Sequence, residues 1–522
     1  MDRRNFLRLG AGGAGAAAVG LALPACSPMT PTPTSVYSAG VASGLHSPTE
    51  VVLWTRVEPA LAPGVTSVTW EVADSAGFGT VVASGTAPVS AASDHTVKVL
   101  VGGLDPDRSY WYRFSTGAAD SPVGRARTMP VAGAAVGSLK LAYASCQCYA
   151  NGYYGAWRDV ATRDVDAVLF LGDYIYEAGL IQLLGKVRDE SFETVTDLAG
   201  YRSKYKLYKS DPDLQAAHAA HPFVPIWDDH EIVNDYDRTI FTTEPARAAA
   251  AYQAWFEYQP VWPIDGTRIY RDLPWGDLGH LFMLDTRQYR DPHRGGAPLY
   301  GTRDITTFET AAGRSILGAD QRSWLTGGLA AAEAAGTTWK VIGNQVLIMP
   351  LRVRDDDTPA ARAADPSLPL HAGAYTTANF DTWDGYAWER DLLLRSLADG
   401  SIRNTVFLTG DYHAWWQSPL TPDFDDPAAP VVANEFAAGA ISSAGGANNE
   451  NVLYGDAVLA PFAPRPAYID GLNNGYGLLE ADASTLTVTY LKNDAQFAGS
   501  VPVPRVRFTL EAGDPNATQE LL

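Results

Sequence analysis

Residues 167–177 read Ala167-Val168-Leu169-Phe170-Leu171-Gly172-Asp173-Tyr174-Ile175-Tyr176-Glu177, an apolar run that changes abruptly into a polar cluster. A short apolar run bounded by a glycine turn predicts a buried β-strand. In layered α/β folds, ligands gather beyond the carboxyl ends of such strands. This junction therefore predicts a core strand whose end carries functional side chains, with Asp173 and Tyr176 first among them.

Further apolar runs end in polar clusters in the same way, and we expect all of these clusters to face one site because loops at one sheet edge converge. The runs and clusters are 139–143 before Ser145-Cys146-Gln147-Cys148, 223–227 before Asp228-Asp229-His230-Glu231, 281–284 before Asp285-Thr286-Arg287, 340–342 before Gly343-Asn344-Gln345, and 405–408 before Gly410-Asp411-Tyr412-His413.

Amphipathic stretches between these runs predict helices over 153–162, 247–258, 319–335 and 383–397. Late strand-like runs at 486–491 and 506–510 predict an antiparallel sheet. The expected catalytic fold is therefore α/β, with a β-sandwich core flanked by helices, over residues 131–522.

The preceding residues 36–130 have a different character. Short aromatic and β-branched runs broken by turns predict a small all-β domain of the immunoglobulin or fibronectin III kind. No polar cluster in it suggests catalysis, so we interpret it as a packing module. A Pro/Ser/Thr-rich stretch, 27–35, is typical of a linker.

The first 26 residues resemble an export signal. Arg3-Arg4 precede a mildly apolar run from Leu9 to Leu23, a pattern typical of a twin-arginine signal, which would make the twin-arginine translocase a partner and the protein periplasmic, envelope-anchored or secreted. The run is shorter than the roughly 20 strongly apolar residues of a membrane-spanning helix, the alternative interpretation. The segment ends in Leu23-Pro24-Ala25-Cys26, which is similar to a lipobox with a lipid anchor at Cys26; cleavage elsewhere and full secretion stay open.

The formal net charge of -20 argues against a general nucleic-acid-binding surface, because nucleic acid is held mainly by Lys and Arg. A small phosphorylated substrate remains compatible with this charge if metal ions and one or two arginines meet it locally. We expect a monomer.

The clusters together offer a thiolate, a phenolate, several carboxylates and histidines. Thiolate and phenolate suit ferric iron, whereas carboxylates and amides suit calcium. Cys146 and Cys148 are too close in sequence for an unstrained mutual disulfide, so Cys146 is either a metal ligand or an inert buried thiol. Asp173, directly after a core strand, is the candidate to bridge two metals.

The motifs Ser145-Cys146-Gln147, Gly172-Asp173-Tyr174-Ile175-Tyr176, Asp228-Asp229-His230-Glu231, Asp285-Thr286-Arg287 and Gly410-Asp411-Tyr412-His413 resemble those of the alkaline phosphatase D (PhoD) family of the metallophosphoesterases. The resemblance implies Fe³⁺ on Cys146, Tyr176 and His413, with Asp173 bridging to Ca²⁺. It places Asp411 and either Asp229 or Asn234 on the calcium side, with Gln345 near the same metal. Asp229 departs from the family, where relatives often have Asn.

The implied reaction is attack of metal-activated hydroxide on phosphorus, with His230 protonating the leaving group or contacting phosphate, and Arg287 clamping phosphate. Structural interpretations remain for each residue. Arg287 could pair with Asp285 or Asp291, and Asp229 with His230 could cap a helix beginning at Glu231.

The predicted function is that of an exported metal-dependent phosphatase acting on phosphomonoesters and also on diesters. One alternative is a phosphodiesterase or phospholipase D-like hydrolase on the same scaffold. The insertions 178–205, 355–381 and 424–454 would form the walls that decide between them. A second alternative is a non-catalytic envelope module that binds phosphate or carbohydrate through residues 36–130.

Overall fold

The structure is a computed structural model, and it describes residues 32–178, 186–191, 193–295, 300–304, 308–353, 376–443 and 468–522. The predicted signal segment, with Arg3, Arg4 and Cys26, lies outside the described residues. Within the described ranges, no helix has both the length and the apolar character needed to cross a membrane.

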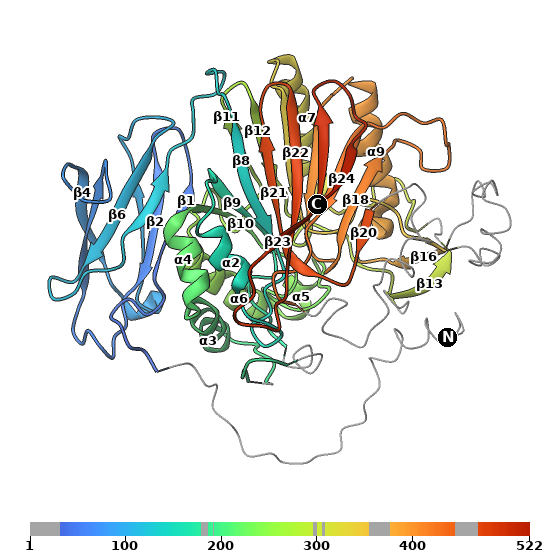
Figure 1. Cartoon of the computed structure of the whole chain (residues 1–522). Helices are drawn as coiled ribbons and strands as arrows, with labels where there is room; N and C mark the ends of the chain where they lie inside the picture. Colours follow the sequence, from blue (N-terminus) through green and yellow to red (C-terminus); the bar gives the residue numbers. More distant parts are fainter. Residues whose placement is uncertain are drawn as a thin grey trace, which may run out of the picture.

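Two large sheets form the centre of the molecule (Figure 1). The first is ten-stranded, in the order β24 (Thr518–Leu521), β23 (Val503–Glu511), β22 (Thr485–Asn493), β21 (Asn474–Ala481), β8 (Leu139–Ala144), β9 (Ala167–Leu171), β10 (Pro222–Ile226), β1 (Val41–Leu45), β2 (Val51–Arg56) and β5 (Thr96–Val101). The second is seven-stranded, in the order β11 (Arg271–Trp275), β12 (Gly279–Met283), β14 (Trp339–Asn344), β17 (Thr405–Thr409), β19 (Ala433–Ala437), β18 (Trp415–Leu420) and β20 (Tyr468–Asp470).

The strands that carry the predicted clusters sit side by side in these sheets. β8, β9 and β10 are parallel neighbours in the first sheet, and β12, β14 and β17 are parallel neighbours in the second. Parallel strands end at the same edge of a sheet, so all six clusters emerge on one side. The expected α/β sandwich architecture is confirmed.

The N-terminal residues form a four-stranded sheet, in the order β4 (Val81–Pro88), β3 (Ser67–Ala73), β6 (Ser109–Ser115) and β7 (Gly124–Arg127), at one end of the molecule in Figure 1. The other strands of this all-β region join the catalytic sheet. β1 pairs in parallel with β10, so β1, β2 and β5 extend the catalytic sheet. This pairing gives β10 a second neighbour, and a buried strand with both edges paired leaves no backbone groups unsatisfied.

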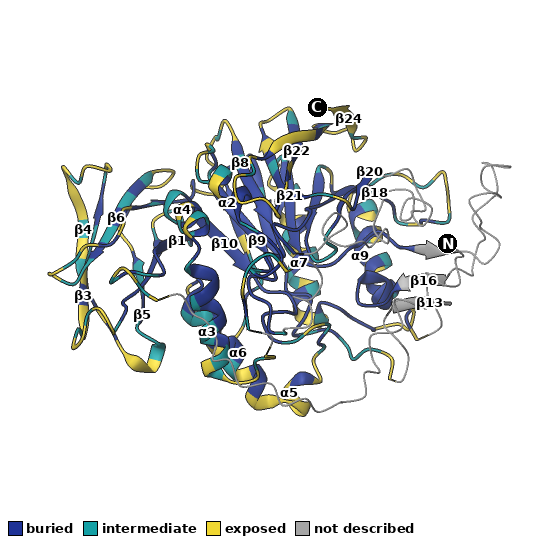
Figure 2. Cartoon of the chain, turned by 60° about the horizontal axis from the view of Figure 1, so that its bottom comes forward, coloured by how far each residue is buried: buried dark blue, intermediate teal, exposed yellow. Residues whose placement is uncertain are grey.

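Helices cover the outer faces of the two sheets and bury their apolar sides (Figure 2). On the first sheet they are α2 (Gly155–Val160), α3 (Leu198–Lys209), α4 (Pro212–Ala220) and α6 (Pro245–Tyr258), and the short, mostly exposed α5 (Ile240–Thr243) packs against α6. On the second sheet they are α7 (Gly318–Ala334), the 3₁₀ turn η3 (Trp383–Tyr386) and α9 (Ala387–Asp399). The predicted helix over 383–397 is therefore a 3₁₀ turn continued by an α-helix.

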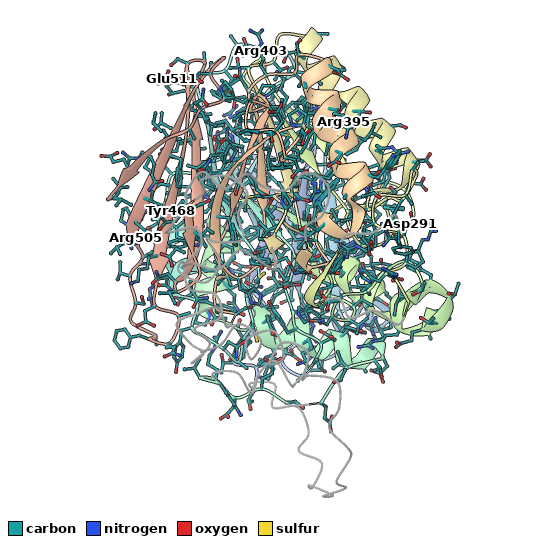
Figure 3. All side chains as sticks on the ribbon, turned by 90° about the vertical axis from the view of Figure 1, so that its right-hand side faces the viewer. Asp291, Arg395, Arg403, Tyr468, Arg505 and Glu511 are labelled. Atoms are coloured by element: carbon teal, nitrogen blue, oxygen red, sulfur yellow. The ribbon has the colours of Figure 1, made fainter. Side chains whose placement is uncertain are left out.

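The layering is also visible from the side, where Arg505 and Tyr468 mark the strand face and Arg395 marks the helix face (Figure 3). The smallest elements are the 3₁₀ turn η1 (Ala91–Ser93) and a three-stranded sheet of β13 (Tyr300–Asp304), β16 (Thr376–Asn379) and β15 (Arg352–Val353). β16 leads directly into η3, and this link carries a residue that matters for the site below.

Candidate metal centre

The ends of the six core strands bring their polar side chains into one buried region. Three overlapping groups of side chains lie within it. Inside each group, the candidate ligand atoms all lie within 4.8 Å of one another. The groups are Cys146, Asp173 and His413; Asp173, Asp229 and His230; and Asp228, Asp229 and Asp411. Because successive groups share Asp173 or Asp229, the ligands form a continuous row between the two sheets.

The first group contains the thiol predicted as an iron ligand. Tyr176 joins it, since its Oη lies 3.0 Å from Asp173 Oδ2 and 3.1 Å from His413 Nε2. Cys146 and Tyr176 are fully buried, whereas His413 is partly exposed. The structure therefore assembles Cys146, Asp173, Tyr176 and His413, the set that the sequence analysis placed around one metal.

The backbone at these residues is strained. Cys146, Asp173, Asp411 and His413 have φ values of 58°, 60°, 63° and 54°. Non-glycine residues rarely adopt this left-handed region, which costs about 1–3 kcal/mol per residue and persists where the surroundings demand it. Gly172 (φ 107°) precedes Asp173, and a Cβ there would lie 2.4 Å from Asp228 Cβ. The tight turns aim the side chains inward at one point.

The third group, Asp228, Asp229 and Asp411, is made of carboxylates alone. Asp229 is 2% exposed, and its two oxygens accept hydrogen bonds from the backbone N–H groups of His230 (2.8 Å) and Asp235 (2.6 Å). Asp411 is more accessible, with 18% of its side chain exposed. Asp228 Oδ2 is buried without a hydrogen-bond partner in the part of the chain that the structure describes. A buried carboxylate oxygen without a donor, beside two further carboxylates, fits a cation position.

The electrostatics of the first group also call for a cation. Burial raises the pKa of the Cys146 thiol well above its usual value, and the charge of Asp173 raises it further. Burial likewise raises the pKa values of Tyr176 and Asp173, and also that of Asp411 in the third group. The chain alone therefore favours protonated ligands. A bound metal ion reverses this balance, because it stabilises thiolate, phenolate and carboxylate directly.

His230 is held beside this row by a buried carboxylate. Its Nδ1 lies 2.7 Å from Glu177 Oε2, and its ring packs 4.2 Å from the Tyr176 ring. Burial opposes its charge, but the surrounding carboxylates, Asp229 first, raise its pKa well above the usual range. Since the carboxylate of Glu177 can only accept, Nδ1 carries a proton and Nε2 is the nitrogen left for chemistry.

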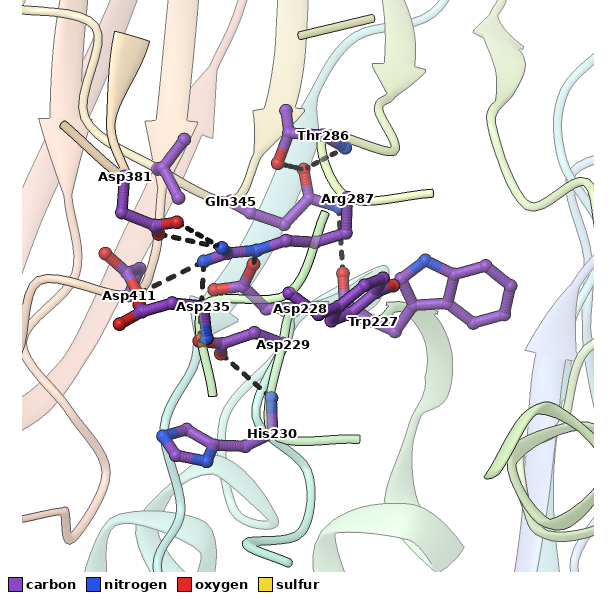
Figure 4. Close-up of polar contacts among 12 residues, drawn as sticks. Trp227, Asp228, Asp229, His230, Asp235, Thr286, Arg287, Gln345, Asp381 and Asp411 are labelled. Carbon is purple, nitrogen blue, oxygen red and sulfur yellow. Dashed lines mark hydrogen bonds and ion pairs between the residues drawn. The ribbon is translucent and has the colours of Figure 1, made fainter. Parts of the chain in front are cut away.

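Arg287 is fully buried and surrounded by carboxylates (Figure 4). Its Nε donates to Asp228, and its Nη1 donates to both oxygens of Asp381 at 2.8 and 2.7 Å. The structural interpretation of the sequence, pairing with Asp285 or Asp291, does not hold for the guanidinium, although the backbone N–H of Arg287 donates to Asp285 Oδ1 at 3.1 Å. Sequence alone could not identify the partners of the guanidinium, because Asp381 lies 94 residues away.

Two other expectations from the sequence do not hold. No helix begins at Glu231, since residues 229–235 form turns, so Asp229 is not a helix cap. Gln345, considered near the second metal, uses its Nε2 for the carbonyls of Trp227 (2.9 Å) and Leu284 (2.8 Å), and its Oε1 accepts from Thr286. It therefore ties strand-end loops together and has no group left for a metal.

The choice between Asp229 and Asn234 is also clear in the geometry. Asn234 is exposed, its Nδ2 donates to Asp235 Oδ2 at 2.6 Å, and its backbone N–H donates to Glu177 Oε1 at 3.0 Å. Asp229, by contrast, is buried, and its carboxylate lies within 4.8 Å of ligand atoms of Asp173 and of Asp411.

Several supporting residues were missed by the sequence analysis. Glu231 accepts hydrogen bonds from the backbone N–H groups of Tyr174 (2.7 Å), Asp173 (3.1 Å) and Asp228 (2.9 Å), and so holds two ligand loops together. Ser443 Oγ lies 2.7 Å from Tyr176 Oη. Glu231 stood within a recognised cluster, but Ser443 carries no local signal.

Comparison with known proteins gives consistent matches over both parts of the chain. The family PhoD-like phosphatase matches residues 141–490, and its N-terminal domain matches residues 25–130. Alkaline phosphatase D of Bacillus subtilis (strain 168) is 34% identical over 429 residues, which are 78% of this chain and 70% of that protein.

Solved structures agree. The structure of PhoD superposes with a TM-score of 0.82 at 30% identity, covering 94% of this chain and 93% of the other. The purple acid phosphatase PPD1 of yellow lupin (Lupinus luteus) has a TM-score of 0.52 at 12% identity, covering 90% of this chain and 74% of that one, which shows a shared fold only. From these matches and the buried row of ligands, we conclude that the chain belongs to the PhoD-like phosphatase family and is a phosphoester hydrolase.

Proposed function

We propose that the chain is an exported alkaline phosphatase that uses two metal ions to hydrolyse phosphate monoesters. The observation that carries this proposal is the row of ligand groups sharing Asp173 and Asp229. Two-metal hydrolases place their ions about 3.5–4 Å apart, with shared ligands between them. A row of this kind suits such a pair better than it suits a single ion.

The two ends of the row differ in chemistry. Cys146 and Tyr176 are soft or polarisable anionic donors when ionised, so we assign Fe³⁺ to the end with Cys146, Tyr176, His413 and Asp173. Oxygen donors alone line the other end, and we assign Ca²⁺ to Asp229 and Asp411, with Asp173 shared. When bound, the ions would supply positive charge to the phosphoryl oxygens and make water acidic enough to ionise near neutral pH.

The residues of the chain supply the proton transfer. Glu177 fixes the His230 ring and its Nδ1 proton, so a protonated Nε2 can donate to the departing alkoxide oxygen of the ester. The His230 imidazole lies beside the shared ligands, since one of its nitrogens lies within 4.8 Å of carboxylate oxygens of Asp173 and Asp229. We therefore propose His230 as the general acid.

The partly exposed residues indicate the side from which substrate approaches. Asp411 and His413 are accessible, while Cys146, Asp173 and Asp229 are buried beneath them. We infer that the ester arrives over the loop that follows β17. Arg287 lies on the buried side of Asp229 and Asp411, so we expect it to act through these carboxylates rather than as a direct phosphate clamp.

Metal analysis of the purified protein, together with hydrolysis of chromogenic phosphate monoesters and diesters, tests the proposal. We expect one iron and one calcium per chain, visible charge-transfer absorption, and faster cleavage of the monoester. A faster diesterase reaction would favour the phosphodiesterase alternative. A colourless, iron-free protein with full activity would overturn the iron assignment.

Cys146→Ser and Cys148→Ser form a matched pair, because both thiols are free and fully buried but only Cys146 belongs to a ligand group. We expect Cys146→Ser to lose the visible absorption and most activity, and Cys148→Ser to keep both. Equal behaviour of the two variants would argue against Cys146 as a ligand.

Export through the twin-arginine translocase, a lipid anchor at Cys26 and a monomeric state remain part of the proposal. Replacement of Arg3 and Arg4 by lysine should retain the enzyme in the cytoplasm. Cell fractionation measures this directly, and Cys26→Ala should release the exported enzyme from the membrane fraction. Size-exclusion chromatography with light scattering gives the oligomeric state.

A further inference from the structure

Arg287 connects two carboxylates from different sheets. Asp229 follows β10 in the ten-stranded sheet, and Asp411 follows β17 in the seven-stranded sheet. Arg287 Nη2 lies 3.7 Å from Asp229 Oδ2 and 3.6 Å from Asp411 Oδ1 (Figure 4). Both distances exceed the 2.7–3.2 Å of an N–H···O hydrogen bond, and Nη2 has no hydrogen-bond partner among the described residues.

The guanidinium is held at this distance by the residues on its other edges. Asp228 binds Nε, and Asp381 binds Nη1 through both oxygens. A planar guanidinium held on two edges cannot turn, so Nη2 stays between Asp229 and Asp411 without bonding to either.

Asp381 is itself held by residues other than Arg287. It is 1% exposed and lies on the link between β16 and η3. Arg290 Nη1 donates to its Oδ1 at 2.6 Å, His293 Nε2 lies 3.3 Å from the same oxygen, and its backbone N–H donates to Asn379 Oδ1 at 2.8 Å. Asp381 belongs to none of the ligand groups, so it would act on a metal site without being a ligand, through its hold on Arg287 and through its own charge near Asp229 and Asp411.

The arrangement serves two opposing requirements. Asp229 and Asp411 repel each other, and a nearby positive charge reduces this repulsion. A guanidinium in direct contact, however, would occupy the carboxylate lone pairs that a cation needs. A fixed charge just outside hydrogen-bond distance meets both requirements.

We propose that Asp381 is a positioning residue for the second metal site: by holding Arg287 away from Asp229 and Asp411, it keeps their oxygens available for a divalent cation. The inference rests on the proposed two-metal function. Without Asp381, Nη1 would be an unpaired buried donor, and Arg287 would turn toward the two ligands. The guanidinium of Arg287 faces Asp228, Asp229, Asp381 and Asp411, so we expect an iron site at Cys146, Asp173 and His413 to be retained.

The test is Asp381→Asn in the full chain, with Ca²⁺ titrated into calcium-depleted protein by calorimetry and iron followed by its visible absorption. Removal of a residue that orients a metal ligand typically weakens metal binding about 10- to 100-fold, and we expect Ca²⁺ affinity to fall within this range while the iron absorption is unchanged. Unchanged Ca²⁺ affinity, or loss of iron in parallel, would overturn the inference.

Asp384→Asn is the matched control. Asp384 is equally buried, lies three residues further along the chain and pairs with Arg390, away from the ligand row. It should lose a comparable ion pair and yet bind Ca²⁺ as the wild type does. A similar loss of Ca²⁺ affinity in this control would show that any damage to the η3 region weakens Ca²⁺ binding, and this would contradict the inference.

A double variant separates positioning from support of the fold. If freed Arg287 competes for the ligands, Arg287→Met combined with Asp381→Asn should recover Ca²⁺ affinity relative to Asp381→Asn alone. Additive or worse loss of Ca²⁺ affinity contradicts the mechanism.

Arg287→Lys gives an independent measurement if Asp381→Asn fails to fold. Because a lysine ammonium cannot be held on two edges, this substitution should weaken Ca²⁺ binding. Wild-type protein that binds no divalent ion would overturn both the inference and the proposed function, whereas normal binding by wild type and Asp381→Asn alike would overturn the inference alone.

Discussion

Replacement of Lys209 by methionine should stabilise the fold, and more so at low pH. Lys209 ends α3, is 1% exposed, and its Nζ has no hydrogen-bond partner among the described residues. It lies 4.4 Å from the centre of the Trp54 ring and 5.1 Å from that of Tyr174. Burial, with a smaller contribution from Lys98, lowers its pKa from 10.5 to about 7.

The size and sign of the effect follow from this pKa. Lys209 is a base whose folded pKa lies below its unfolded value, so the unfolded chain binds more protons between about pH 7 and 10.5, and stability rises with pH across that window. A shift of this size corresponds to roughly 5 kcal/mol at low pH, offset by about 2 kcal/mol from the aromatic contacts. Methionine fills similar space without charge, so we expect a gain of about 3 kcal/mol near pH 6 and about 1 kcal/mol or less near pH 10.5.

Urea unfolding of the wild type and Lys209→Met across this pH range measures the difference. Comparing the two proteins cancels the titration of groups that do not interact with Lys209, whereas Lys98 and His218, whose charges couple to it, contribute to the difference. Lys204→Met is the control: Lys204 lies on the same helix and is also buried, but its Nζ pairs with Glu190 Oε1 at 2.6 Å. Breaking such a pair typically costs about 3–5 kcal/mol. Destabilisation by Lys209→Met near pH 6, or a difference that does not shrink with rising pH, would refute the reasoning.

Two further predictions concern the supports of the metal centre. Glu177→Gln keeps the shape of the side chain but weakens the orientation of His230, so kcat should fall about 10²-fold while metal content, measured by mass spectrometry, is unchanged. Loss of metal would instead give Glu177 a role in ligand geometry. Glu231→Gln leaves one of the backbone N–H groups bound by Glu231 without an acceptor, so we expect a loss of about 2–3 kcal/mol in unfolding free energy together with weaker metal binding. Unfolding by urea and metal retention during dialysis measure the two effects, and normal values for both would contradict the role assigned to Glu231.

Local pattern was sufficient to predict much of the fold. The runs before Cys146, Asp173 and Asp411 are continuous and apolar because β8, β9 and β17 are buried on both faces, and such runs are recognisable without any partner. The polar cluster after each run could be recognised in the same way, because it begins where the apolar run ends. The expectation that the clusters share one site depended only on the rule that parallel strands end at a common edge.

The extension of the catalytic sheet by the N-terminal strands had no comparable signal. β1 is short and contains a serine and a glycine, and its pairing with β10 joins residues about 180 positions apart. Gly44 allows β1 to lie close to the segment at Pro260, because a Cβ at Gly44 would lie 1.9 Å from the carbonyl oxygen of Pro260. Such a close approach is a property of two distant segments and cannot be read from either one.

The sequence by itself determined the chemistry of this protein: which donors stand at strand ends, and which metals those donors favour. These features are local, because a strand and the turn that follows it are adjacent in the chain. The tertiary structure alone decided which charges surround them. The Arg287 guanidinium pairs with Asp228 and Asp381, because buried charges are compensated by whichever groups the folded sheets bring near. Folding likewise buries Asp229 beside the other ligands and leaves Asn234 exposed.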